Sequence, residues 1–258
     1  MHFPKKASAK SIPLSPLTCF FLLLFLLIPF KSYADTSFCS GQLLNGLTYF
    51  IHHNPLSKKH ISLDFVIKVG PLDEQEDEKG FSHLIEHSLG HNMEFKGKKI
   101  TDLRCQIWDF SSPNIEALTT YDFTQFHFDI SLAIPQALEE TLLGMAKPLS
   151  PFFLDEPYLR SMKDEILEEL DEIELSPVES WKRWKITQEY PQYRDKHPQG
   201  TQETISQASV EKLHQFYEKK YQPHRMALII MGNVDLQRTK ELIEKNFGHL
   251  LLRIKKRS

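Results

Sequence analysis

Alternating apolar and polar residues along the chain predict several strands. Residues 61–69 alternate and then become fully apolar before Gly70 and Pro71 end the run, as a sheet strand does. In 124–132, every second residue is Phe, Ile or Leu, which indicates one buried and one wetter face. Further strands are predicted at 43–53 (entered through the turn Asn45–Gly46), at 115–121 (paired with 124–132) and at 226–231.

Helical spacing of apolar residues predicts the remaining elements. Gly80 opens a helix through about Leu89, and a long helix begins at Pro157 and runs past Ile173 toward Tyr190. Residues 196–207 are predicted as a loop. Other helices are predicted at 99–110, 135–147, 210–221 and 236–247. Together these elements predict an α+β fold, a mostly antiparallel sheet with helices packed on it.

The N-terminus has the pattern of a secretory signal peptide. Lys5, Lys6 and Lys10 precede the apolar run 19–30, and the small-x-small site 32–34 follows. We therefore predict a signal peptide at 1–34, a single domain at 35–258, and export to the periplasm or the medium. An uncleaved anchor helix is the alternative, although the run is shorter than the roughly 20 apolar residues of a membrane span. No other stretch is predicted to span a membrane.

Composition narrows the class of protein without identifying it. The 258 residues suit one large or two small domains, and 41% apolar and 25% charged residues are ordinary for a globular protein. A net charge of −3 with interspersed signs does not favour a nucleic-acid partner. Cys39 and Cys105 remain after signal cleavage, and either a disulfide or two free thiols fit an exported protein.

The helix that begins at Gly80 carries candidate metal ligands. His83 and His87 are four residues apart, so they project about 40° from each other on one face. Two imidazoles so placed can hold one zinc ion, and Glu86 lies on the flank of that face as a candidate catalytic base. Because the other positions are apolar, this polar stripe would be buried and needs a partner. Hydrogen-bonded structural histidines are the alternative.

A third ligand is predicted on the long helix. Glu169 follows Met162 by seven residues, nearly two turns, so it should point inward with the apolar stripe. Glu165, about 60° from Met162, is the nearest competitor on that helix. His91 is the other rival, ranked lower because Gly90 and Asn92 indicate that its helix ends there. Two histidines and one glutamate leave a fourth position for water, which is typical of a catalytic zinc (Zn2+) rather than a structural one.

These residues resemble the inverted zinc motif of the M16 metallopeptidases, the family of pitrilysin, insulin-degrading enzyme and the mitochondrial processing peptidases. The motif is His83-x-x-Glu86-His87 after Gly80-Phe-Ser. Similar segments follow the family's order from about Leu43 to Phe247, including those around Asn45–Gly46, Phe95-x-Gly97, Ile166–Leu170, Pro198-x-Gly200, Tyr221-x-Pro223 and Met231–Asn233. The resemblance also selects Glu169 as third ligand.

The resemblance implies a substrate that lies extended beside the strand at 115–121, with Glu116, Ala117 and Thr119 as substrate-binding positions. The chain departs from the family at two of its residues: Glu116 stands where the family usually has asparagine, and Met162 where it often has a second glutamate. Loss of a residue that supports a ligand can weaken metal affinity 10–100-fold.

Family enzymes also pair two such domains around a chamber, and this chain has only the first. We therefore expect a second domain of this type, as a separate chain or a homodimer.

Two functions follow as expectations. The first is a zinc-dependent endopeptidase that hydrolyses short or unfolded peptides outside the cytoplasm, with no nucleic-acid partner and no stable membrane span after signal cleavage. The second is a non-catalytic or partner-dependent half-enzyme subunit of a two-chain M16-type protease. A structural zinc module is weaker, because a structural site usually adds cysteine and the motif helix has none.

Overall fold

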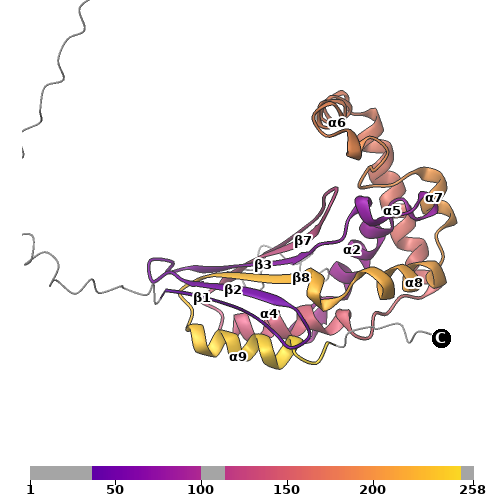
Figure 1. Ribbon diagram of the computed structural model, residues 1–258. Coiled ribbons are helices and arrows are strands. Elements are labelled where there is room, and N and C mark those ends of the chain that lie inside the picture. Colours follow the sequence, from indigo (N-terminus) through magenta and orange to yellow (C-terminus); the bar gives the residue numbers. More distant parts are fainter. Residues whose placement is uncertain (1–36, 100–113, 251–258) are drawn as a thin grey trace, which may run out of the picture. The chain divides into compact units, whose positions relative to one another are not determined.

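A six-stranded sheet forms the centre of the domain in the computed structural model, which describes residues 37–99 and 114–250 (Figure 1). The strand order is β1-β2-β8-β3-β7-β6. Neighbours are antiparallel except β2 and β8, which are parallel, so the predicted α+β class with a mostly antiparallel sheet is confirmed. The strands are β1 Phe38–Gln42, β2 Thr48–His53, β3 His60–Ile67, β6 Asn114–Thr119, β7 Thr124–Ser131 and β8 Met226–Gly232. A separate small hairpin pairs β4 Glu94–Phe95 with β5 Lys98–Lys99.

One face of the sheet is buried, as the alternation in β3 and β7 predicts. Phe65 lies opposite Phe126, with ring centroids 6.3 Å apart, and Phe247 packs on Phe65 at 6.0 Å. Helices α4 Ala137–Ala146 and α9 Leu236–Phe247 cover this face beneath β1 and β2 (Figure 1). Their apolar sides complete the core.

The other helices gather at one end of the sheet (Figure 1). They are α2 Phe81–Asn92, α5 Glu156–Leu175, α6 Pro177–Glu189, α7 Gln202–Gln207 and α8 Val210–Lys220. Single-turn 3-10 helices lie at Pro71–Asp73, Glu76–Glu78, Lys147–Leu149, Pro191–Tyr193 and Pro223–Arg225. Helix α2 contacts β6, β7, α5 and α8, so its side chains meet both the sheet and the long helix.

The structure corrects four boundaries. Of the strand predicted at 43–53, only Thr48–His53 is a strand, β2; residues 43–47 form the turn, and the unpredicted strand β1 precedes them and pairs with β2. The predicted long helix ends at Leu175, because Ser176 is extended and Pro177 begins α6. The predicted loop contains α7, which the side chain of Thr201 caps. Helix α2 continues through Gly90 to Asn92, whose side chain donates to the carbonyl of Ser88 at 2.8 Å.

Some predictions lie outside the described residues: the signal peptide at 1–34, most of the helix at 99–110, and Cys105. Cys39 is a half-buried free thiol. Within the described ranges, no helix has the length and apolar character to cross a membrane.

Candidate metal centre

The first turn of α2 is fixed by a buried carboxylate. Glu74, 2% exposed, accepts hydrogen bonds from the backbone N–H groups of Gly80 (2.9 Å) and Ser82 (2.8 Å). It satisfies donors that a helix start leaves without partners. Burial raises the pKa of this carboxyl to about 7, and the two backbone bonds oppose the shift only in part. The anchored turn sets the direction in which the following histidines point.

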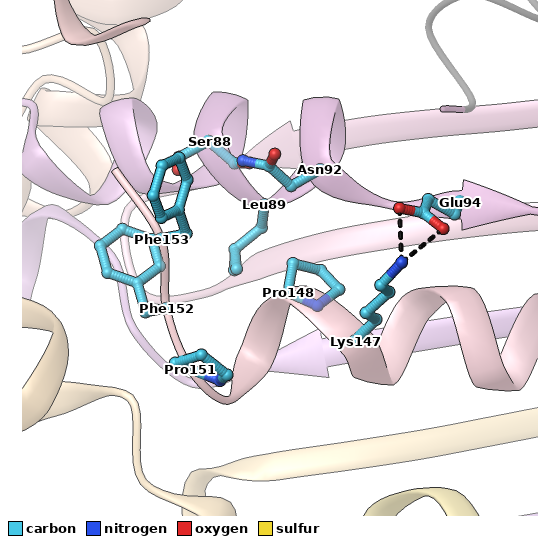
Figure 2. A pocket seen from close by; sticks show the side chains of 9 residues that line it. All are labelled: Ser88, Leu89, Asn92, Glu94, Lys147, Pro148, Pro151, Phe152 and Phe153. Atoms are coloured by element: carbon cyan, nitrogen blue, oxygen red, sulfur yellow. Dashed lines mark hydrogen bonds and ion pairs between the residues drawn. The ribbon is translucent and has the colours of Figure 1, made fainter. Parts of the chain in front are cut away.

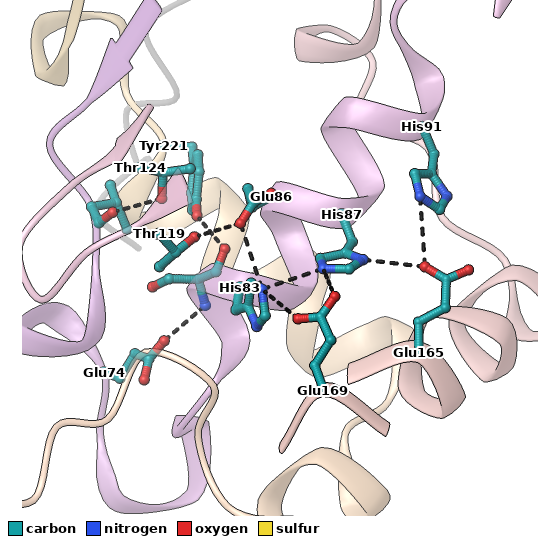
Figure 3. Close-up of polar contacts among 12 residues, drawn as sticks. Glu74, His83, Glu86, His87, His91, Thr119, Thr124, Glu165, Glu169 and Tyr221 are labelled. Atoms are coloured by element: carbon teal, nitrogen blue, oxygen red, sulfur yellow. Dashed lines mark hydrogen bonds and ion pairs between the residues drawn. The ribbon is translucent and has the colours of Figure 1, made fainter. Parts of the chain in front are cut away.

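Three of the predicted ligands come together between α2 and α5 (Figure 3). Nε2 of His83 lies 3.3 Å from Nε2 of His87 and 3.5 Å from Oε2 of Glu169. Nε2 of His87 lies 3.6 Å from Oε1 of Glu169. We call His83, His87 and Glu169 the first triad. Glu169 reaches the histidines from the flank of the apolar stripe and its side chain is 44% exposed, so the expected inward, buried carboxylate is wrong in burial.

The spacing within the first triad fits a tetrahedral zinc ion. Bonds of about 2.0–2.1 Å at tetrahedral angles place ligand atoms about 3.4 Å apart. The separations of 3.3, 3.5 and 3.6 Å, of which the last two go to different oxygens of the Glu169 carboxylate, lie near that value and exceed the usual 2.7–2.9 Å of charge-assisted hydrogen bonds. The residues present therefore fit zinc, with two neutral nitrogen donors and one carboxylate.

Burial also keeps His83 in the form that binds metal. Desolvation, helped by the nearby His87 and His197, lowers the pKa of His83 to about 3. The imidazole is therefore neutral near pH 7, and one ring nitrogen keeps its lone pair. For the same reason, the 3.6 Å approach of His83 Nε2 to Glu86 Oε2 is not an ion pair at neutral pH.

Glu86 is held beside the first triad by a residue predicted for another role. Oγ1 of Thr119 donates to Oε2 of Glu86 at 3.0 Å, and both side chains are buried (Figure 3). Burial raises the pKa of Glu86, which moves proton exchange at this carboxyl toward neutral pH. Thr119 was predicted to bind substrate, but its hydroxyl is committed to Glu86 and positions that carboxylate.

The other two predicted substrate residues lie on an accessible strand. Glu116 and Ala117 are exposed on β6, and β6 packs beside α2. β6 is the edge of the sheet, with only β7 as neighbour among the described residues. No described strand pairs with its outer edge, which lies near the first triad because Thr119 of β6 contacts Glu86 of α2.

Sequence reasoning underrated two residues. His91 lies on α2 after all, and its Nε2 is 3.6 Å from Oε2 of Glu165. The same carboxylate oxygen is 3.3 Å from Nδ1 of His87. We call His87, His91 and Glu165 the second triad. The sequence signal for His91 is a third histidine at four-residue spacing, and Gly90, which favours a helix end, does not interrupt α2.

A pocket lies on another side of α2 (Figure 2). Lys147 donates to both carboxylate oxygens of Glu94 at 2.7 Å at its rim. The metal ligands do not line it, so it is separate from the first triad. Its lining comprises Ser88, Leu89, Asn92, Glu94, Lys147, Pro148, Pro151, Phe152 and Phe153.

Known proteins resemble this chain in sequence. The family model described as the Peptidase M16 inactive domain matches residues 207–256, and no residue of either triad lies in that range. The probable zinc protease PqqL of Escherichia coli (strain K12) is 25% identical over 252 residues, covering 90% of this chain and 26% of that protein. The chloroplastic stromal processing peptidase of Arabidopsis thaliana is 26% identical over 216 residues, covering 81% of this chain and 16% of that protein. The chain thus spans about a quarter or less of these relatives.

Solved structures share the fold. The periplasmic protease PqqL from Escherichia coli superposes with a TM-score of 0.71 at 23% identity, covering 86% of this chain and 24% of that chain. The first half of the same protease gives 0.72 at 23% identity, covering 86% of this chain and 47% of that one. The comparisons therefore bear out the resemblance predicted from the sequence: the chain is similar in sequence to proteins named zinc proteases, a model of an M16 peptidase domain matches its C-terminal part, and it shares the fold of solved M16-like peptidases.

Proposed function

We propose that the chain is a zinc-dependent endopeptidase that hydrolyses short or unfolded peptides outside the cytoplasm. The observation that carries this proposal is the first triad, whose ligand atoms are 3.3–3.6 Å apart, with buried Glu86 beside it. Curated relatives are named zinc proteases, which supports the metal and the reaction class. His83, His87 and Glu169 would hold the ion and leave a fourth position open.

The residues around the ion divide the chemistry among them. A bound zinc supplies Lewis acidity, which lowers the pKa of water and polarises a peptide carbonyl. Oε2 of Glu86 lies 3.6 Å from Nε2 of His83 and accepts the hydrogen bond of Thr119, which orients the carboxylate so that it can accept the proton of the attacking water. The raised pKa of Glu86 suits a carboxyl that later returns this proton to the leaving amine.

An extended peptide is the substrate that the neighbouring strand favours. A peptide added to the open edge of β6 would gain backbone hydrogen bonds regardless of its sequence. Exposed Glu116 and Ala117 would face its side chains. Most backbone groups of a folded protein are already paired within it, whereas those of short or unfolded peptides are free to pair with β6, so such peptides are the proposed class.

Metal analysis and peptide hydrolysis of the purified chain test the proposal. We expect zinc at one ion per chain, and hydrolysis that a chelator abolishes and zinc restores. Glu86→Gln should keep the zinc and lose about 10²–10⁴-fold in rate, the usual contribution of a general base. Glu168→Gln, exposed on α5, is the matched control. A Glu86→Gln variant as fast as the parent would falsify the assignment.

A half-enzyme that needs a partner is the second candidate. Two observations favour it: the chain spans 26% of PqqL, and α6 exposes Trp181 and Trp184 at 57% and 60%. The proposed partner is a complementary M16-type domain, as a separate chain or a second copy. Activity that appears only when such a domain is added would select this candidate, and full activity of the isolated chain would exclude it.

Export is part of the proposal. The periplasmic protease PqqL is a structural neighbour, and the apolar run with its small-residue site supports a signal peptide at 1–34. N-terminal sequencing of the exported protein should begin at Asp35. An intact N-terminus on membrane-bound protein would support the anchor instead.

A further inference from the structure

Helices α2 and α5 form a ladder of ligand atoms that extends beyond the first triad (Figure 3). Along α2 the histidines recur every four residues, at 83, 87 and 91, while along α5 the carboxylates recur in the opposite direction, at 169 and 165. His83 and His87 meet Glu169, whereas His87 and His91 meet Glu165. The second triad therefore repeats the first triad one helical turn away.

We propose that the second triad is a second cation site, on the solvent side of the first. Nδ1 of His87 and Nε2 of His91 both approach Oε2 of Glu165, and one ligand atom from each of the three residues lies within 4.8 Å of the others. The separations from Oε2 are 3.3 Å and 3.6 Å, again close to the roughly 3.4 Å of a tetrahedral ion. Two imidazoles and one carboxylate suit zinc, cobalt or nickel and disfavour calcium and magnesium, which prefer oxygen ligands.

The surroundings hold these side chains in place. The ring of Tyr158 packs against His91, with centroids 5.9 Å apart, and limits the rotamers of that histidine. Glu86 lies beside the first triad, with Oε2 3.6 Å from Nε2 of His83, and Thr119 fixes it there. Within residues 37–99 and 114–250 no comparably held base lies beside the second triad, so the second triad would hold an ion without performing the reaction.

The two sites share His87 through opposite ring nitrogens. The first triad uses Nε2 and the second uses Nδ1. A neutral imidazole has one lone pair, because its other nitrogen carries a proton. One chain therefore holds one ion, in either site, and an ion that moves inward exchanges one nitrogen of His87 for the other.

The exposed fractions of the three histidines indicate the direction in which the ion would move. The side chain of His91 is 30% exposed, that of His87 is 13% exposed and that of His83 is 7% exposed. The two carboxylates are similarly exposed, at 44% for Glu169 and 42% for Glu165, so the gradient lies in the histidines. An ion from solvent meets His91 of the second triad before it reaches buried His83, one helical turn beyond His87. The second site is accordingly a loading step for the first.

Zinc and cobalt binding to variants of the full chain test the second site without using activity. His83→Ala should still bind one ion with lower affinity. His83→Ala with His91→Ala, and His83→Ala with Glu165→Gln, should each bind at least about 100-fold more weakly than His83→Ala alone. His83→Ala with Glu168→Gln should match His83→Ala. If the His91 and Glu165 changes have no effect in that background, the second site does not exist, whatever the outcome for peptidase activity.

Loading kinetics test the order of the two sites. In the otherwise unchanged chain, His91→Ala should leave the equilibrium zinc affinity within about twofold, because the first triad is intact. The rate of zinc uptake, followed by stopped-flow competition with a fluorescent chelator, should fall at least about tenfold. Uptake as fast as in the parent overturns the loading role. Circular dichroism confirms that each variant is folded.

Discussion

Helices α5 and α6 follow one another with only Ser176 between them, yet they differ in what they contact. α5 buries Leu159, Met162, Ile166 and Leu170 against the domain and presents Glu165 and Glu169 to α2. α6 buries none of its residues and stands apart from the sheet (Figure 1). The difference teaches that this domain brings all three candidate metal ligands together by itself, whereas α6 leaves apolar surface without a partner in this chain's described residues.

The largest effect should follow from removing the ligand that α5 supplies. Glu169→Gln replaces an anionic donor by a neutral amide, so zinc affinity should fall at least about 100-fold, more than most losses of a supporting residue. Competition with a chelator of known affinity measures it. Glu168→Gln, exposed on the neighbouring face, should bind as the parent does. Equal binding by Glu169→Gln would mean that α5 contributes Glu165 instead.

The packing of the two helices can be compared next. Ile166 is fully buried, so Ile166→Ala should lower the free energy of unfolding by about 2–5 kcal/mol through lost burial and a cavity. Val178 on α6 is 59% exposed, and Val178→Ala should change the free energy of unfolding by less than about 0.5 kcal/mol. Urea denaturation measures both. A comparable loss at Val178 would show that α6 packs on the domain in solution.

The contrast between α5 and α6 also marks where sequence reasoning ends. Periodicity predicted β3, β7, β8, α8 and α9 because each buries one face. Missed elements lack that signal: β1 has no buried residue, and α7 has one. The break at Ser176 was readable, since proline cannot continue a helix and starts one well. The acidic residues before Ser176 also suit a helix, so the prediction extended the helix past this break.

The sequence predicted which residues form the candidate site better than it predicted which of them contact one another. Motif spacing placed His83, Glu86 and His87, and helix phase chose Glu169. Phase alone could not tell that α2 packs against the flank of α5, which brings in Glu165 as well as Glu169. Nor could it show that Thr119 holds Glu86, because that contact joins residues 33 positions apart. Met162 lies in the core, so no carboxylate supports the ligands from that position.

The starts of the site helix and of α6 should respond differently to pH. Burial raises the pKa of Glu74 from 4.5 to about 7, so the folded state holds this proton more tightly than the unfolded state between those values. Its contribution to the free energy of unfolding therefore decreases as pH rises from about 4.5 to 7, by up to about 3 kcal/mol.

Glu74→Gln should remove this pH dependence. It should also lower the free energy of unfolding by the same amount at every pH, because one hydrogen bond to the backbone at the start of α2 is lost. Ser176→Ala, which removes the side-chain acceptor for Glu179 N–H, should cost about 1 kcal/mol at every pH. Urea denaturation at several pH values between 4.5 and 8 gives both curves. The same slope in the parent and in Glu74→Gln would assign the dependence to another group.

The smallest effect on the fold should come from the exposed tryptophans of α6. Trp181→Ser with Trp184→Ser removes two side chains that are 57% and 60% exposed, so the free energy of unfolding should change by less than about 0.5 kcal/mol. Zinc affinity should not change, because neither residue belongs to either triad. Association with a complementary M16-type domain should instead weaken by at least about tenfold, since buried tryptophans dominate many interfaces. Analytical ultracentrifugation, with exposed Gln188→Ser on the same helix as control, separates the two effects. Unchanged association would mean that the partner, if it binds, uses a surface other than α6, and the contrast between the two helices would then concern packing alone.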